Sequence, residues 1–331
     1  MAVRFLFPLL LLLLLCCIRF SESKLSTTYY QKTCPDFENI MRNTITSKQL
    51  SNPTTAAAAL RLFFHDCMVD GCDASVLISS NAFNKAERDA DLNLSLSGDA
   101  FEVIVRAKTA LELSCPGIVS CADILAVATR DLVTVVGGPF YKVRLGRKDS
   151  MVSKVDRVEG NLPRQNMTID EIISHFTTKG FSVQEMVALI GGGHTIGFTH
   201  CKEFADRLYR YNNTTPTDPK LNPKYAAALK KMCENYTTDI GMSAFNDVMT
   251  PSKFDNMYFK NLQRGLGLLM SDTAMVYDGK TRPLVELYAV NQTAFFNDFS
   301  HAMEKLSVYG VKTGRKGEVR RRCDAFNSIQ T

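Results

Sequence analysis

The chain has 331 residues, of which 45% are hydrophobic, and its 39 lysines and arginines exceed its 34 acidic residues by only five. The positive charges are scattered except at Arg320, Arg321 and Arg322, and aromatic residues do not interleave with them. This mild, dispersed charge argues against nucleic-acid binding and favours an ordinary solvated surface.

Residues 1–23 have the pattern of a secretory signal peptide. Arg4 precedes an apolar stretch of about 14 residues, which is shorter than the roughly 20 residues that a membrane-spanning helix needs. No later segment reaches that length. We therefore expect an exported protein without stable membrane insertion, in which residues 24–331 form the folded part.

Apolar periodicity along the rest of the chain predicts an all-α, mainly helical fold. In residues 121–136 apolar side chains recur at spacings of three and four, and a Gly-Gly-Pro sequence follows. Alternating, strand-like stretches are few and short. The other helix-like segments are residues 36–50, 56–66, 100–114, 200–211, 223–234, 255–263, 283–290 and 293–307.

Two capping boxes predict two short helices in succession. In such a box a serine or threonine and a glutamate three residues later close the first helical turn. Residues 168–171 lead to a terminal Gly180, and residues 182–185 lead to Ile190 and Gly191. No linker or repeat divides the folded part, so we expect one domain with two lobes.

Cysteine usage agrees with export. Eight cysteines follow residue 23, and an even number in an oxidising compartment predicts disulfides, although spacing alone leaves the pairing open. Zinc is disfavoured because Cys67 and Cys72 form a lone close pair. Sequences that permit N-glycosylation begin at Asn93, Asn166, Asn212, Asn213, Asn235 and Asn291.

Five histidines are the main candidates for chemistry, and His175, His200 and His301 have the features of ordinary surface or core residues. His65 follows Arg61 by four residues, which places both on one helical face. A neighbouring cation lowers the pKa of a histidine and keeps its imidazole neutral and able to act as a base. A purely structural histidine is the alternative.

A short loop after this helix carries hard oxygen ligands, and a disulfide between Cys67 and Cys72 could close it. Oxygen ligands in a braced loop suit calcium, whereas a solvated acidic turn is an equally simple interpretation. The side chains concerned are those of Asp66, Asp70, Asp73 and Ser75.

His194 follows three glycines, just after the helix predicted to end at Ile190. Glycines leave room for a close-approaching group, and a flat cofactor would fit such an opening. From spacing alone, a glycine-rich helix end with an incidental histidine is the simpler interpretation.

Taken together, these segments strongly resemble the secreted plant (class III) haem peroxidases. The similarity runs from about residue 25 to 323 in the family's order, and it includes all eight cysteines. It is carried by residues 61–67, 71–75, 119–124, 145–149, 192–197 and 254–256. The resemblance implies one haem b between a distal lobe, mainly residues 24–165 with the C-terminal part, and a proximal lobe, mainly residues 166–292.

The resemblance also implies the reaction and its residues. Hydrogen peroxide would oxidise small phenolic donors in two one-electron steps. His194 would bind the haem iron, and Asp272 would accept a hydrogen bond from its other ring nitrogen. On the opposite face His65 would move the protons of peroxide and Arg61 would stabilise the developing charge.

Further roles follow by the same resemblance. Asn93 would fix the tautomer of His65, and Glu87 would orient Asn93, so the glycosylation sequence at Asn93 is expected to be buried and unused. Phe64 would lie beside the haem, and the carbonyl of Pro163 would bind phenolic donors.

The family further implies two calcium ions and four disulfides. Each calcium would steady one catalytic histidine, because Asp66 adjoins His65 and Thr195 adjoins His194. The distal site would use Asp66, Asp73 and Ser75 with the carbonyls of Val69 and Gly71, and the proximal site would use Thr195, Asp247, Thr250 and Asp255 with the carbonyl of Lys253. The implied disulfides are Cys34–Cys115, Cys67–Cys72, Cys121–Cys323 and Cys201–Cys233.

This chain departs from the family pattern near the haem edge. Asp91 and Glu203 stand where aromatic residues are common, Arg164 follows Pro163, and Thr54 replaces a usual arginine. We hypothesise that this polar edge weakens the binding of small hydrophobic phenols. We expect a monomer in the cell wall or apoplast rather than the vacuole, since only a short tail follows the last cysteine.

Two other functions agree less well with the sequence. An inactive wall-binding glycoprotein that keeps only the scaffold would not need the complete catalytic set. A calcium-dependent hydrolase would need a nucleophile motif such as Gly-x-Ser-x-Gly, which the chain lacks.

Overall fold

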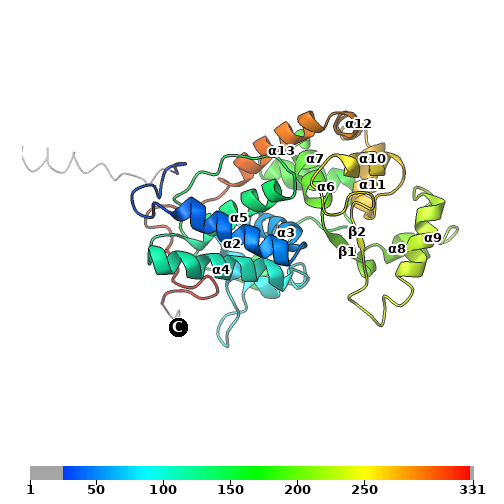
Figure 1. Cartoon of the computed structure of the whole chain (residues 1–331). Coiled ribbons are helices and arrows are strands. Elements are labelled where there is room, and N and C mark those ends of the chain that lie inside the picture. The colour runs from blue at the N-terminus through cyan, green and yellow to red at the C-terminus, as the bar shows by residue number, and fades with distance from the viewer. Residues whose placement is uncertain (1–24, 329–331) are drawn as a thin grey trace, which may run out of the picture.

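The computed structural model describes residues 25–328, so the signal peptide expected at residues 1–23 lies outside the described residues. Within them the chain folds into helices α2 to α13 and one two-stranded antiparallel sheet, which confirms the predicted mainly helical class (Figure 1). None of the helices in this part of the chain has the length and apolar character needed to cross a bilayer.

The first group of helices contains α2 (Phe37–Ser51), α3 (Thr55–Met68), α4 (Gly98–Ser114) and α5 (Cys121–Val135), which pack against one another (Figure 1). Helix α5 begins where the Ser120 hydroxyl accepts a hydrogen bond from the backbone N–H of Asp123, and most of its side chains are buried. Helix α3 buries alanines and leucines against α5, so its opposite face remains available to position Arg61 and His65.

The second group contains α6 (Ile169–Thr178), α7 (Val183–His194), α10 (Met257–Gln263), α11 (Met270–Tyr277), α12 (Arg282–Val290) and α13 (Gln292–Leu306). Both predicted capping boxes are present, at the starts of α6 and α7. Packing of α7 against α13 holds the end of α7 in place, and a cluster of phenylalanine rings fills the space between the helices. This group positions His194 and Asp272.

A smaller group with its own core lies at one end of the molecule (Figure 1). It contains β1 (Phe198–His200), β2 (Ser243–Phe245), α8 (Ala205–Tyr209) and α9 (Pro223–Met232), and Phe198 is paired with Phe245 across the sheet. Short 3₁₀ helices complete the fold at Ser75–Leu77, Glu87–Asp89, Val155–Arg157 and Cys201–Glu203.

Most predicted helices are confirmed to within two or three residues, and three differences matter. The helix predicted over residues 200–211 is wrong in its first half, which ends β1 and forms a 3₁₀ turn before α8. Helix α7 continues through the glycines to His194 rather than ending near Ile190. Helix α11 was not predicted from periodicity at all. The division of the chain into two lobes stays a prediction.

The four disulfides join the cysteines in the pairs that the family resemblance implies: Cys34–Cys115, Cys67–Cys72, Cys121–Cys323 and Cys201–Cys233. The segment after α13 runs back to the first group of helices (Figure 1). There Cys323 is bonded to Cys121 at the start of α5, so the C-terminal segment is joined covalently to the first group of helices.

Candidate active site

Helix α3 places Arg61 and His65 one turn apart, as the sequence predicts. The Nε of Arg61 donates a hydrogen bond to Nε2 of His65 over 3.3 Å. The same guanidinium also donates to the Ser95 carbonyl at 3.0 Å, to the Ser95 hydroxyl at 2.9 Å and to the Leu92 carbonyl at 3.4 Å. These loop contacts, which sequence reasoning missed, fix the side chain of Arg61 beside the imidazole.

Asn93 holds the other side of the His65 ring. Its Oδ1 accepts from Nδ1 of His65 at 2.6 Å, and its Nδ2 donates to the backbone carbonyl of Glu87 at 2.8 Å. Because an amide oxygen can only accept, the ring proton is on Nδ1 and the lone pair is on Nε2. Asn93 is buried, so its side chain is occupied by these bonds rather than exposed for glycosylation.

Glu87 reaches Asn93 through its backbone and not through its carboxylate. The Glu87 side chain instead accepts a hydrogen bond from the hydroxyl of Ser75 at 2.8 Å. Glu87 therefore links the bond network of His65 to the acidic loop that follows α3.

The environment of His65 favours a neutral imidazole. Burial, reinforced by the positive charge of Arg61, lowers the pKa of His65 to about 3. At neutral pH Nε2 is thus unprotonated, and it can accept a proton from a reacting group that takes the place of Arg61 as its hydrogen-bond partner.

His194 ends α7 and is bound to a buried carboxylate. Its Nδ1 lies 2.9 Å from Oδ1 of Asp272, whose side chain is only 2% exposed. The ring of Tyr258 packs edge-on against the His194 ring. Burial acts to lower the pKa of His194, but Asp272 outweighs this effect and raises it. The positive charge of Arg61 also acts to lower this pKa, but it does not outweigh Asp272.

Two of the three glycines before His194 have a different role from the one expected. A Cβ at Gly191 would overlap the ring of Phe259, and one at Gly192 would overlap the ring of Phe299, whereas a Cβ at Gly193 would meet nothing within 4 Å. Two of the three glycines therefore make room for neighbouring helices. Only Gly193 faces open space of the kind that was expected for a cofactor.

This packing gives a first prediction for Gly192→Ala. The added methyl group must displace the Phe299 ring in a filled core, and such overpacking destabilises a protein by about 1–3 kcal/mol. Thermal or urea unfolding of the variant measures the loss. Gly98→Ala is the control because it adds the same methyl group to a helix at an exposed site with nothing within 4 Å. Equal stability of the two variants would contradict the prediction.

The residues around His194 fit a haem. A metal-binding imidazole usually gives its second N–H to a carboxylate, which is the arrangement of His194 with Asp272. Six residues later, Nδ1 of His200 is buried without a hydrogen-bond partner within residues 25–328. Buried polar atoms nearly always have a partner, so a polar group from outside the chain suits this position. The ring of Phe64 lies beside that of His65, 6.3 Å away between centroids.

The loop after α3 brings together the side chains proposed for a distal calcium ion. Asp66, Asp73 and Ser75 are buried, and the backbone N–H groups of Ala74 and Ser75 donate to the two aspartates. Burial raises the pKa of Glu87 to about 9 and, together with the like charge of Asp73, also raises the pKa of Asp66. Crowded, buried carboxylates of this kind fit a bound cation.

The proximal set also converges. The Thr195 hydroxyl donates to the Asp255 carbonyl at 2.7 Å, and the Thr250 hydroxyl lies 3.2 Å from Asp247 and 3.1 Å from Asp255. Lys253 lies beside these residues, with its Nζ 3.7 Å from the Asp255 carboxylate. Within residues 25–328 no three His, Cys, Asp or Glu side chains form a metal cluster by themselves, so either calcium would need hydroxyl and carbonyl oxygens as well.

The expected donor edge is polar. Pro163 is partly buried, and two residues later Gln165 donates a hydrogen bond to the carboxylate of Glu203 at 2.6 Å. Arg164 pairs with Glu159, and Asp91 is exposed. Of the departures noted in the sequence, Arg164 and Glu203 thus make polar contacts with neighbouring residues, and Asp91 faces solvent.

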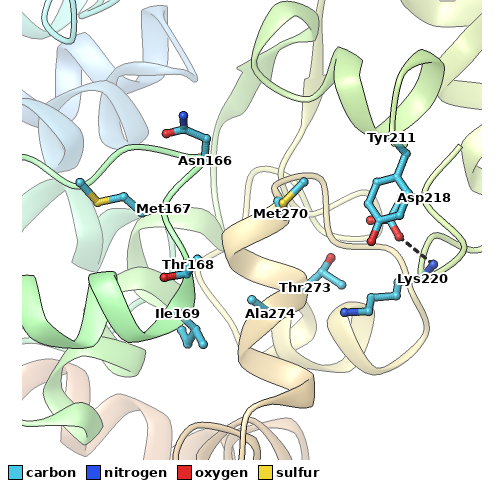
Figure 2. A pocket seen from close by; sticks show the side chains of 10 residues that line it. All are labelled: Asn166, Met167, Thr168, Ile169, Tyr211, Asp218, Lys220, Met270, Thr273 and Ala274. Carbon is cyan, nitrogen blue, oxygen red and sulfur yellow. Dashed lines mark hydrogen bonds between the residues drawn. The ribbon is translucent and has the colours of Figure 1, made fainter. Parts of the chain in front are cut away.

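A separate cavity of about 250 Å³ lies between the start of α6, the start of α11 and the loop after α8 (Figure 2). Its walls include Met167, Ile169, Tyr211, Lys220 and Met270. Sites that enclose drug-sized ligands span roughly 300–1,000 Å³, so this cavity is small. None of the predicted catalytic residues lines it.

Comparisons with known proteins agree with this geometry. The family model described as "Peroxidase" matches residues 38–291. Peroxidase 65 and Peroxidase 41 of Arabidopsis thaliana are each 63% identical over 305 residues, covering 92% of this chain and 90% and 92% of their own lengths. Peroxidase 63 of the same plant is 59% identical over 325 residues, which cover 96% of this chain and 97% of that protein. The chain therefore belongs to the class III haem peroxidases of plants, and it is a peroxidase.

Proposed function

We propose that His65, Arg61 and Asn93 form the peroxide-cleaving side of the active site and that His194 with Asp272 holds the iron of one haem b. This assignment rests on one observation: the two imidazoles have opposite electrostatic environments. One is neutral, fixed by an amide and placed beside a guanidinium, whereas the other is bonded to a buried carboxylate.

A bound haem supplies the redox chemistry, since it can pass two electrons to peroxide and recover them singly from donors. Overall, one hydrogen peroxide and two phenols give two waters and two phenoxyl radicals, so each phenol loses one electron and one proton. Nε2 of His65 accepts a proton from the attacking peroxide oxygen and returns it to the leaving oxygen, which departs as water. Arg61 stabilises the negative charge on the leaving oxygen.

Asn93 and Asp272 act through the two histidines. Asn93 keeps the proton of His65 on Nδ1, so that the lone pair of Nε2 is directed at the substrate. Asp272 makes the His194 ring more electron-rich, which strengthens it as a ligand and favours cleavage of the O–O bond.

We also propose small phenolic donors that bind near Phe64 and the carbonyl of Pro163. The charged side chains of Asp91, Arg164 and Glu203, which stand where the family pattern differs, support weaker binding of small hydrophobic phenols than aromatic residues would give. Tight binding of an aromatic hydroxamate would count against this part of the proposal.

Two calcium ions and an extracellular location complete the proposal. The converging oxygen ligands around Asp66 and Asp247 support one ion beside each histidine. Four disulfides and the signal-like residues 1–23 support secretion to the cell wall or apoplast, and we propose that the protein acts there as a monomer.

The proposal is tested by spectroscopy on haem-loaded protein. We expect a Soret absorbance band that shifts when hydrogen peroxide is added and returns when a phenol is supplied. Initial rates with a panel of monolignols and simple phenols then rank the donors. Correctly folded, haem-loaded protein whose spectrum does not respond to peroxide would refute the assignment.

A further inference from the structure

Three buried carboxylates lie close together around the loop that follows α3. Asp66, Asp73 and Glu87 are each 1% exposed. Ser75 joins two of them, because its backbone N–H donates to Asp73 at 3.1 Å and its hydroxyl donates to Glu87 at 2.8 Å. Carboxylates crowded into a small, dry region are unfavourable as anions unless cations balance them.

Lys312 supplies one such cation from the C-terminal segment. Its Nζ contacts Oδ2 of Asp73, and its side chain is only 26% exposed. Backbone hydrogen bonds also fix the same segment at and just before this contact. The carbonyl of Lys312 accepts from the N–H of Lys148 at 2.8 Å, and the carbonyl of Tyr309 accepts from the N–H of Cys72 at 3.0 Å.

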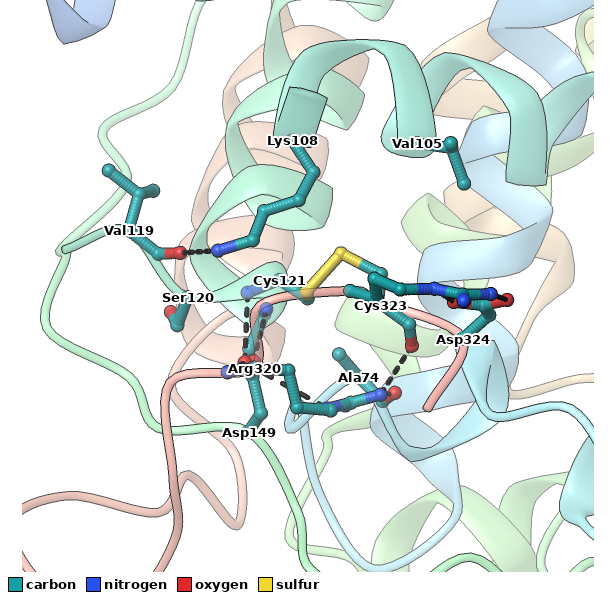
Figure 3. The surroundings of a disulfide bond; sticks show 12 residues. Ala74, Val105, Lys108, Val119, Ser120, Cys121, Asp149, Arg320, Cys323 and Asp324 are labelled. Atoms are coloured by element: carbon teal, nitrogen blue, oxygen red, sulfur yellow. Dashed lines mark hydrogen bonds and ion pairs between the residues drawn. A yellow bond between two sulfur atoms is a disulfide. The ribbon is translucent and has the colours of Figure 1, made fainter. Parts of the chain in front are cut away.

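The C-terminal segment is fastened to the same region a second time (Figure 3). Arg320 lies between Asp149 and Ala74: its backbone N–H donates to Asp149 at 2.9 Å, and its guanidinium donates to the Ala74 carbonyl at 2.6 Å. The Cys121–Cys323 disulfide lies beside this contact. The segment that carries Lys312 is therefore attached to the region around Asp73 at several points along its length.

We propose that Lys312 is a built-in counter-cation of the calcium loop. It holds Asp73 in place when calcium is absent, and it lowers the affinity of the loop for calcium when the ion binds. The inference rests on the distal calcium ion proposed above. Because the ammonium group and calcium are both positive and share the Asp73 carboxylate, each weakens the binding of the other.

The variant Lys312→Met tests this proposal because it keeps the length of the side chain and removes its charge. We expect one calcium ion to bind about tenfold more tightly, since a unit charge is removed from within a few ångströms of the ion in a partly buried site. After chelation, the variant is expected to unfold at a lower temperature than the wild-type protein. Competition with a calcium chelator gives the affinity, and circular dichroism follows unfolding.

Two controls isolate the charge. Lys312→Arg keeps a cation at the same position and is expected to retain calcium affinity close to that of the wild-type protein. Lys316→Met removes an exposed lysine from the same segment and is expected to change neither measurement. Asp73→Asn identifies which of the binding steps belongs to this loop.

The possible results distinguish the role of Lys312 from the assignment of a calcium ion to the loop. Unchanged calcium affinity in Lys312→Met, with calcium still bound at the loop in the wild-type protein, would overturn the role of Lys312 alone. Calcium binding to the wild-type protein that Asp73→Asn does not alter would overturn both the loop assignment and this inference. If calcium bound more tightly to both Lys312→Met and Lys316→Met, the lower net charge of the protein would explain the change. That result would also overturn the proposed role of Lys312.

Discussion

His194→Ala protein is expected to be purified almost free of haem. The substitution removes the imidazole that we assign to the iron, and the ring is held there by Asp272 at 2.9 Å. Loss of a supporting residue alone costs roughly 10–100-fold in metal affinity, so loss of the ligand itself is expected to exceed about 100-fold. The ratio of Soret to protein absorbance and the rate of haem transfer to an acceptor protein measure the effect.

Two companion variants make this result specific. Asp272→Asn keeps the shape of the partner but removes its charge, so haem affinity is expected to fall between those of the wild-type and His194→Ala proteins. His175→Ala is the control for a histidine outside the site, since His175 contacts the Asn161 carbonyl. His194→Ala protein that retains haem as firmly as His175→Ala would remove His194 as the ligand.

The helices that could be predicted from the sequence are those whose ends are set locally. Thr168 and Ser182 close the first turns of α6 and α7 with glutamates three residues away, so a short stretch of sequence contains the whole signal. Helix α11 lacks such a signal: it has eight residues and begins after Leu269, which makes no side-chain cap. The buried guanidinium of Arg207 binds the carbonyls before α11 and the hydroxyl of Thr273. The start of α11 thus depends on Arg207, which is more than sixty residues away in the sequence.

The same distinction explains the error over residues 200–211. Their apolar spacing is compatible with a helix, but residues 198–200 pair with residues 243–245 in the two-stranded sheet. A strand partner more than forty residues away cannot be read from local periodicity.

Within the candidate site, the sequence was most informative where residues are close along the chain. The spacing of Arg61 and His65 on one helical face was sufficient to predict their contact. Asp272 lies 78 residues beyond His194, and only the family resemblance connected them. Lys312 was not singled out, because its contact with Asp73 depends on the return of the C-terminal segment to the first group of helices.

His65→Ala is expected to retain haem and to lose most of its reactivity with peroxide. His65 lies on α3 rather than on the helix assigned to the iron, so its removal leaves His194 and Asp272 in place. General acid–base catalysis by a positioned side chain contributes typically 10²–10⁴-fold, and we expect a fall of this size in the rate constant for peroxide. Stopped-flow absorbance at the Soret band measures that constant directly.

Asn93→Ala tests whether the geometry of the base matters as well as its presence. The variant keeps His65 but removes the acceptor that holds the ring proton on Nδ1, so the rate with peroxide is expected to fall by less than in His65→Ala. His301→Ala replaces an exposed histidine and is the control for both variants. If His65→Ala reacted with peroxide at the rate of His301→Ala, proton transfer would have to be assigned to another group.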